Sequence, residues 1–249
     1  FDSSNNKVVI AWEDKGNSEY GTAIVGTVDP SDNSISFGSA VVFESAAVEE
    51  ISIVFDSSNN KVVIAYKDEG NSDYGTAIVG TVSGTSISFG SAAVFNSANT
   101  RETHSDFDST NNKVIIGYRD NGNSSYGTAI VGTVSGTSIS FGSEVVFRSG
   151  TTNDIYVAHN PDTGTTLFIA DVPSGDVIKE TWWRLVWEGG ELICYGKAVT
   201  KEGFSPKTLE ELNKDVSVVS FDDEGDVDFI KVSGAPEMIS GLAKHYDSR

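Results

Sequence analysis

The strongest constraint on the fold of this chain is an internal repeat. The segment FDSSNNKVVIAWEDKGNSEYGTAIVGTV starts at Phe1, and close copies start at Phe55 and Phe107, so the copies are spaced by 54 and 52 residues. Each copy continues into a second shared block, SISFGSAVVF, SISFGSAAVF or SISFGSEVVF. A decayed fourth copy is visible at residues 159–171, HNPDTGTTLFIAD. A fixed period of this kind indicates a repeat architecture, in which each unit buries its apolar face against its neighbours.

Each repeat is predicted to contain four short strands. In the second copy they cover residues 50–54, 61–66, 75–82 and 86–95, which are rich in Val, Ile, Thr and aromatic residues. Asn59-Asn60 and Ser83-Gly84-Thr85 are expected to form tight turns, because Asn and Gly tolerate a positive φ. Four antiparallel strands in a unit of about 40–50 residues are typical of a β-propeller blade.

We therefore predict a mainly β chain with a β-propeller at residues 1–178, as copies 1–54, 55–106 and 107–158 and a partial copy 159–178. Propellers usually have about four to eight blades, so the ring needs further material. It is either a small ring closed with help from the C-terminal region, or an arc of a larger ring. We favour the arc, completed by further sequence or by another subunit of a homo-oligomer or larger assembly. The start at Phe1, inside a repeat, suggests a processed or truncated chain.

A loop of pattern D-x-G-N-S-x-Y-G is constant in the three full copies, and an aromatic residue precedes it. In a structural interpretation, Asp accepts backbone N–H bonds, Gly supplies a positive φ, and Tyr closes the hairpin. In a functional interpretation, a ring stacks on a sugar while Asp and Asn bind its hydroxyls, giving one weak site per blade. The ligand-binding candidates are Trp12, Asp14, Asn17, Tyr20, Tyr66, Asp68, Asn71, Tyr74, Tyr118, Asp120, Asn123 and Tyr126.

Other recurring positions have simpler interpretations. Glu13, Lys67 and Arg119 occupy equivalent places and change charge, so we expect them to face water. Two sets of phenylalanines recur with apolar neighbours and are expected to form the core between blades: Phe37, Phe89 and Phe141, and Phe43, Phe95 and Phe147.

Metal binding and catalysis have weak support in the sequence. Asp2, Asp56 and Asp108 begin short polar turns, but each turn offers one carboxylate, whereas calcium loops bring several. An acidic turn containing Asp222, Asp223 and Asp226 is a weak metal candidate, and a solvated hairpin turn explains it equally well. We expect no cofactor, with calcium as the alternative, and no catalytic group is nominated, since the three histidines are scattered.

The C-terminal residues 179–249 differ in composition and are predicted to form a small α+β domain. Strands are expected at 182–187, 192–199, 216–221 and 227–232, and helices at 205–213 and near Pro236. Alternatively, its strands complete the divergent fourth blade.

The formal net charge of -19 makes nucleic-acid binding unfavourable, because a phosphate backbone would be repelled. No stretch approaches the roughly 20 apolar residues needed to cross a bilayer. The evenly distributed acidity is typical of a soluble surface.

Two resemblances follow from the repeat FDSSNNKVVIAYKDEGNSDYGTAIVGTVSGTSISFGSAAVF. It resembles the repeat arrays of surface and tail-fibre-like proteins of marine bacteria and their phages, over residues 1–171. In layout it is also similar to sialidase-type propeller repeats, although no copy has the S-x-D-x-G-x-T-W box. The arginines of this chain do not recur by repeat, so the sialidase reaction is not implied.

From these observations we expect a non-enzymatic binding or structural protein. It would be a propeller-bearing appendage of a virion or bacterial surface, outside the cell, that recognises glycans or a partner protein. The alternatives are a propeller-type glycoside-processing enzyme, supported by paired carboxylates in a pocket, and a spacer for the C-terminal domain.

Overall fold

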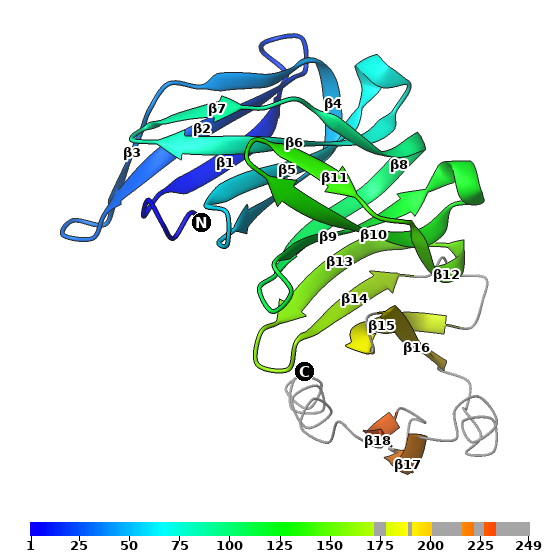
Figure 1. The fold of residues 1–249 in the computed structure, drawn as a ribbon. Helices are drawn as coiled ribbons and strands as arrows, with labels where there is room; N and C mark the ends of the chain where they lie inside the picture. The colour runs from blue at the N-terminus through cyan, green and yellow to red at the C-terminus, as the bar shows by residue number, and fades with distance from the viewer. Residues whose placement is uncertain (172–177, 189–190, 201–215, 222–226, 233–249) are drawn as a thin grey trace. The chain divides into compact units, whose positions relative to one another are not determined.

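The structure is a computed structural model that describes residues 1–171, 178–188, 191–200, 216–221 and 227–232 (Figure 1). The chain divides into two compact units, residues 1–171 with 182–196, and residues 172–181 with 197–249. The described residues are mainly β, with two short 3-10 turns and no α-helix. None of the described helices is long and apolar enough to cross a membrane.

Each full repeat forms an antiparallel meander, and we number the sheets 1 to 4 along the chain. Sheet 2 consists of the second half of β4, then β5 and β6, and finally β7 together with the first half of β8, both of which pair with the same edge of β6. Sheets 1 and 3 repeat this pattern, except that sheet 1 begins at β1. The strands are β1 (Val8–Asp14), β2 (Tyr20–Asp29), β3 (Ser34–Phe37), β4 (Val41–Asp56), β5 (Lys61–Asp68), β6 (Tyr74–Ser83), β7 (Ser86–Phe89), β8 (Ala93–Asp108), β9 (Lys113–Asp120), β10 (Tyr126–Ser135), β11 (Ser138–Phe141) and β12 (Val145–Thr151).

The outer strand of each sheet differs from the sequence prediction. The single strand expected at 86–95 is broken after Phe89, and its second part continues without interruption into the next repeat as β8. Gly90 lies at the break, and a Cβ at this position would lie 1.9 Å from the carbonyl oxygen of Thr137 in the next repeat, so only glycine fits there. One 16-residue strand then closes one sheet and opens the next.

We call the segments that open each sheet the lead-in strands: residues 48–56, residues 100–108, and β13 (Asn153–Asn160). They lie side by side in chain order. The Ser105 N–H donates to Ser52 Oγ at 2.8 Å, and the Val157 N–H donates to His104 Nδ1 at 3.1 Å. Side chains of one lead-in strand thus bind the backbone of the next, which holds the sheets in sequence. No closed ring is present among the described residues.

The core lies between successive sheets. Because side chains alternate along a strand, each sheet has a front face toward the preceding sheet and a rear face toward the following one. Ile64 and Tyr66 on the front of sheet 2 pack against Val25 and Phe43 on the rear of sheet 1. The rear of sheet 2 packs in the same way on the front of sheet 3, and sheet 3 packs on sheet 4. Strands β5 and β9 are therefore buried on both faces.

The predicted core phenylalanines are confirmed with one exception. Phe43, Phe95 and Phe147 are buried, and Phe89 and Phe141 are partly buried against the core. Phe37 is 48% exposed, so its assignment to the core was wrong. The physical reason is that its face of sheet 1 has no preceding sheet among the described residues.

The predicted tight turns are confirmed. Asn60 and its equivalents Asn6 and Asn112 have φ values of 53°, 54° and 56°, and Gly84 has a φ of 62°. Asn and Gly adopt this left-handed conformation with the least strain.

Strands also occur where the C-terminal sequence predicted them. Sheet 4 contains β13, β14 (Thr165–Asp171), β15 (Ile178–Glu188) and β16 (Glu191–Thr200), so two strands of the C-terminal region pair with the fourth copy. Strands β17 (Val216–Phe221) and β18 (Val227–Val232) form a separate antiparallel pair. The two predicted helices and the acidic turn at 222–226 lie outside the described residues.

Candidate functional site

The constant loops join β1 to β2, β5 to β6, and β9 to β10, at the same end of each sheet. Their aspartates cap the turns. Asp14 Oδ1 accepts the Gly16 N–H at 3.1 Å, Asp68 Oδ1 accepts the Asn71 N–H at 3.1 Å, and Asp120 Oδ1 accepts the Gly122 N–H at 2.9 Å. The predicted role of Asp as an acceptor of backbone N–H bonds is confirmed.

The loop glycines have a different role from the predicted one. The positive φ values belong to the serines and the residues after them, such as Ser72 at 59° and Asp73 at 63°. Gly70 is required for another reason, because a Cβ there would lie 2.4 Å from the Cβ of Ala46. Gly122 has the same contact with Ala98 at 2.4 Å. The glycines therefore allow close approach of the preceding segment and do not supply the turn.

Two of the three aromatic residues before the loops pack in the core. Tyr66 and Tyr118 are fully buried, with ring centroids 5.2 Å from Phe43 and 5.1 Å from Phe95. Burial raises the pKa of both phenols, and the carboxylates of Glu44 and Glu144 raise them further. Their rings are closed to a sugar, so these two positions act in packing. Trp12, the equivalent residue of sheet 1, is half-buried.

The other loop candidates reach the surface. Asn17, Asn71 and Asn123 are exposed, and the tyrosines that follow them, Tyr20, Tyr74 and Tyr126, are half-buried at the start of the second strand of each sheet. Each of the three sheets therefore has one exposed asparagine and one half-buried tyrosine at the same end. This is the part of the predicted sugar site that remains accessible.

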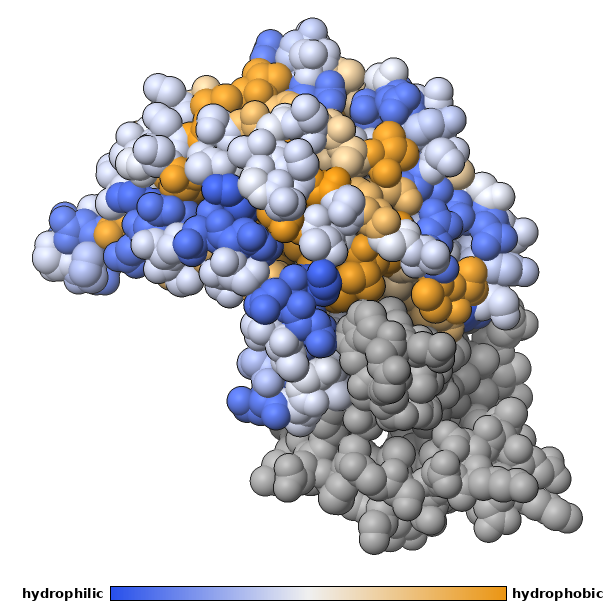
Figure 2. Space-filling view, in the orientation of Figure 1, coloured by the Kyte–Doolittle hydropathy of each residue, from blue (hydrophilic) through white to orange (hydrophobic). Residues whose placement is uncertain are grey.

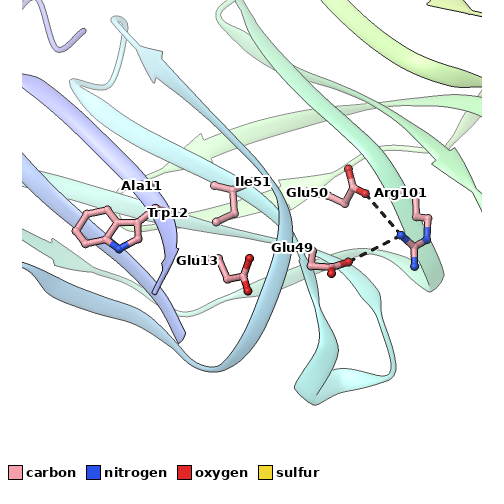
Figure 3. A pocket seen from close by; sticks show the side chains of 7 residues that line it. All are labelled: Ala11, Trp12, Glu13, Glu49, Glu50, Ile51 and Arg101. Carbon is pink, nitrogen blue, oxygen red and sulfur yellow. Dashed lines mark ion pairs between the residues drawn. The ribbon is translucent and has the colours of Figure 1, made fainter. Parts of the chain in front are cut away.

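A hollow of about 520 Å³ lies beside β1 (Figure 3). It is lined by Trp12 and Glu13 of β1, Glu49 and Glu50 of β4, and Arg101 of β8. The Glu13 side chain points toward the β4 residues, whereas the Trp12 ring points to the other side of β1 (Figure 3). The guanidinium nitrogen Nη1 of Arg101 lies 3.9 Å from a carboxylate oxygen of Glu49 and 3.9 Å from one of Glu50. One cation thus lies between two neighbouring carboxylates at the rim of the hollow.

The pKa values of the two carboxylates are shifted in opposite directions. The hydrogen bond from Lys67, at 2.6 Å, holds the pKa of Glu49 below its usual value. Burial, followed by the charge of Glu102, raises the pKa of Glu50. Glu50 also accepts the backbone N–H of Glu102 at 3.0 Å. Its carboxylate therefore has a structural partner as well as access to the hollow.

The environment of Lys67 differs from the sequence prediction. Its side chain is 2% exposed, and its ammonium lies 2.6 Å from Glu49, 2.8 Å from Glu69 and 3.6 Å from Asp73. The expectation that this charge-changing position faces water was wrong here. Burial opposes the charge, but the hydrogen bonds to Glu49 and Glu69 outweigh it and raise the pKa of Lys67.

The described residues offer no group of three or more His, Cys, Asp or Glu side chains that could hold a metal ion. The turn aspartates are already engaged: Asp56 Oδ1 accepts the N–H groups of Ser58 and Asn59, and Asp56 Oδ2 accepts the Asn59 amide. Asp2 and Asp108 cap their turns in the same way. The candidates Asp222, Asp223 and Asp226 lie outside the described residues.

The sequence analysis missed the acidic rim of the hollow. Glu50 and Glu102 are equivalent residues at β-bulges, where both have a φ of 54°. The available signal was the recurrence of an acidic residue, Glu50, Glu102 and Asp154, one repeat apart. The bulge that aims these side chains depends on pairing between strands, so the repeat pattern alone does not reveal it.

Comparison with known proteins adds no assignment to this geometry. No protein-family model matches the chain, and no curated protein matches it.

Proposed function

We propose that the chain is a non-enzymatic recognition protein of a virion or bacterial surface, whose sheets are propeller blades that present repeated glycan-binding loops. The observation that carries this proposal is the exposure of Asn17, Asn71 and Asn123, each with a half-buried tyrosine, in three loops of the same conformation. An amide that binds hydroxyls beside the edge of an aromatic ring suits a ligand that is half apolar. A protein surface is the other partner class for the same loops.

The three repeated loops together are expected to bind a glycan more tightly than one loop does. A single amide and one phenol edge bind a sugar weakly, but three such sites on one rigid array bind a repeated glycan together. The capping aspartates and the close contacts of Gly70 and Gly122 fix the loops, so little conformational entropy is lost on binding.

The test measures binding of the full chain to a glycan array and removes the amides one repeat at a time. Asn17→Ala, Asn71→Ala and Asn123→Ala should lower the signal stepwise, and the triple variant should lose about 100-fold or more in apparent affinity, because avidity is lost. The matched control changes Ser36, Ser88 and Ser140 to Ala, since these residues are also exposed and equivalent in the three repeats. Equal binding by both triple variants would refute the proposal.

One observation favours an enzymatic alternative. Glu49 and Glu50 line the hollow with their pKa values shifted apart, beside Trp12, and paired carboxylates with unequal pKa values are the groups of glycoside hydrolysis. Chromogenic glycosides test it directly. Turnover by the full chain that is lost in both Glu49→Gln and Glu50→Gln would favour the enzyme over the binding protein.

A further inference from the structure

The front face of sheet 1 is apolar, and no sheet covers it among the described residues. Ile10, Val28, Ile35 and Phe37 are 41%, 45%, 44% and 48% exposed, whereas their equivalents in sheet 2, Ile64, Val82 and Ile87, are 0%, 7% and 4% exposed and Phe89 is partly buried. The residues are the same, and only the preceding sheet differs. In the view of Figure 2, apolar side chains reach the surface in several separate groups among hydrophilic ones.

The edge of β1 is also unpartnered among the described residues. The equivalent strand β5 pairs with the lead-in strand of β4, where Glu49 lies opposite Lys67 and Ser52 opposite Ala65. In the part of the chain that the structure describes, β1 pairs only with β2 and stands at the end of the sheet order. The hollow lies along this edge, beside Ala11, Trp12 and Glu13, where the other sheets have a lead-in strand.

A ladder of hydrogen bonds begins at the same place. The Glu102 N–H donates to Glu50 at 3.0 Å, and the Asp154 N–H donates to Glu102 at 3.1 Å. The backbone N–H of each bulge residue thus donates to the carboxylate of the bulge residue one repeat earlier. Glu50 is the first member of the ladder among the described residues, so its N–H has no such carboxylate before it.

We propose that the front face of sheet 1, with the edge of β1, is a docking surface for a further sheet of this same repeat type, which enters with its lead-in strand against β1. The occupant is identified by continuity with the interfaces between sheets 1 and 2 and between sheets 2 and 3. Those interfaces supply what is missing here: a rear face of Val, Ala and Phe side chains, a strand for the edge, and an acidic bulge.

A second copy of this chain is a poorer occupant. The rear faces of sheets 1 to 3 are already covered by the next sheet. On the rear of sheet 4, Ile169 takes the place that Ala65 and Gly117 occupy in sheets 2 and 3, and a Cβ on Gly117 would already lie 2.8 Å from Val157. A bulky side chain at that place prevents the close approach that the other interfaces show.

The charge of Glu13 indicates which repeat sequence fits best against the edge of β1. Glu13 replaces the cations Lys67 and Arg119 of the other sheets, so the incoming lead-in strand needs a basic residue opposite it. In the register of sheet 3, Arg101 lies opposite Arg119. A unit with the sequence of residues 55–106 therefore places Arg101 opposite Glu13.

The experiment adds residues 55–106 directly before Phe1 of the full chain, so that the added lead-in strand runs into Phe1 as it runs into Phe107. We expect amide hydrogen exchange of residues 8–14 to slow by about tenfold or more, toward the rate of residues 62–68, because the edge of β1 becomes paired. The control carries Ala65→Glu and Ala77→Glu in the added copy alone, which places two charges on the rear face that would dock. In this control, the amides of residues 8–14 should exchange as fast as in the original chain.

Three results would overturn the proposal. Unchanged exchange of residues 8–14 in the extended chain is the first, and an added copy that stays unfolded is the second, because its sequence folds between equivalent surfaces in the original chain. The third is a symmetric dimer of the original chain, measured by sedimentation, in which residues 8–14 are already protected. None of these results bears on the glycan-binding loops, which the array experiment tests separately.

Discussion

Sheets 1 and 2 are built from nearly the same sequence but differ in what covers them. Ile10 and Ile64 are equivalent, yet Ile10 is 41% exposed and Ile64 is fully buried. Phe37 is exposed, whereas Phe89 packs against the core. The difference shows that the repeat specifies a sheet with two apolar faces, and that the neighbouring sheets decide which of these faces stabilise the fold.

The largest expected effect comes from shortening the equivalent isoleucines. Ile64→Ala should lower the free energy of unfolding by about 2–5 kcal/mol, because it leaves a cavity between two sheets. Ile10→Ala should cost about 1 kcal/mol or less, because its side chain is already partly in water. Urea titration of both variants at a low protein concentration measures the difference. Equal losses would show that sheet 1 is covered in solution.

Substitution of the loop glycines should give a smaller difference in stability between sheets 1 and 2. Gly70→Ala should destabilise by about 1–3 kcal/mol, because the new Cβ meets Ala46. Gly16→Ala meets only Asp14 Oδ1, at 3.3 Å, and should be neutral or stabilising by up to about 1 kcal/mol, through a less flexible unfolded chain. Thermal unfolding of the two variants compares them. A loss in Gly16→Ala as large as in Gly70→Ala would contradict the role of close approach.

The smallest effects concern Glu49 and Glu50, on the lead-in strand of sheet 2, which has no counterpart in sheet 1 among the described residues. Burial raises the pKa of Glu50, so its stabilising contribution is complete below the unfolded pKa and is lost as the pH rises through the folded pKa. Glu50→Gln keeps an acceptor for the Glu102 N–H and removes this loss. It should therefore raise Tm at pH 7 by about 1–3 °C, with no gain in acid.

Glu49→Gln is the matched control with the opposite sign. The hydrogen bond to Lys67 lowers the pKa of Glu49, so its stabilisation is present above the unfolded pKa and is lost as the pH falls through the folded pKa. Because Glu49 is 46% exposed, the variant should lose only about 0.5–1 kcal/mol at pH 7. Thermal unfolding of both variants from pH 3 to pH 8 measures the two signs. Parallel curves would contradict the assignment of the two shifts.

Much of the local structure was predictable from the sequence. The strands of the second repeat, the turns at Asn60 and Gly84 and the capping by Asp68 follow from side chains acting within a few residues of themselves. The continuous β4 and β8 strands were not predicted, because the two halves of each pair in different sheets, as β8 does with β6 and with β9, and the pattern within one repeat does not show this.

The candidate site was predictable only in part. Comparison of the copies located the loops and their exposed asparagines, but it also nominated Tyr66 and Tyr118, which are buried. A constant aromatic residue in a repeat indicates packing as readily as binding, and the repeat pattern does not separate the two. Glu50 and Arg101 meet at the hollow through adjacent lead-in strands, about a repeat apart in the chain.

The amino-acid sequence by itself determined the repeating unit, its strands and its turns, because these depend on hydrogen bonds and steric preferences between close neighbours in the chain. Only the tertiary structure decided which equivalent residues are buried, that Lys67 is enclosed by carboxylates, and that the front face and the β1 edge of sheet 1 have no partner among the described residues. Burial is a property of the space between two sheets, and identical repeats therefore differ wherever their neighbours differ.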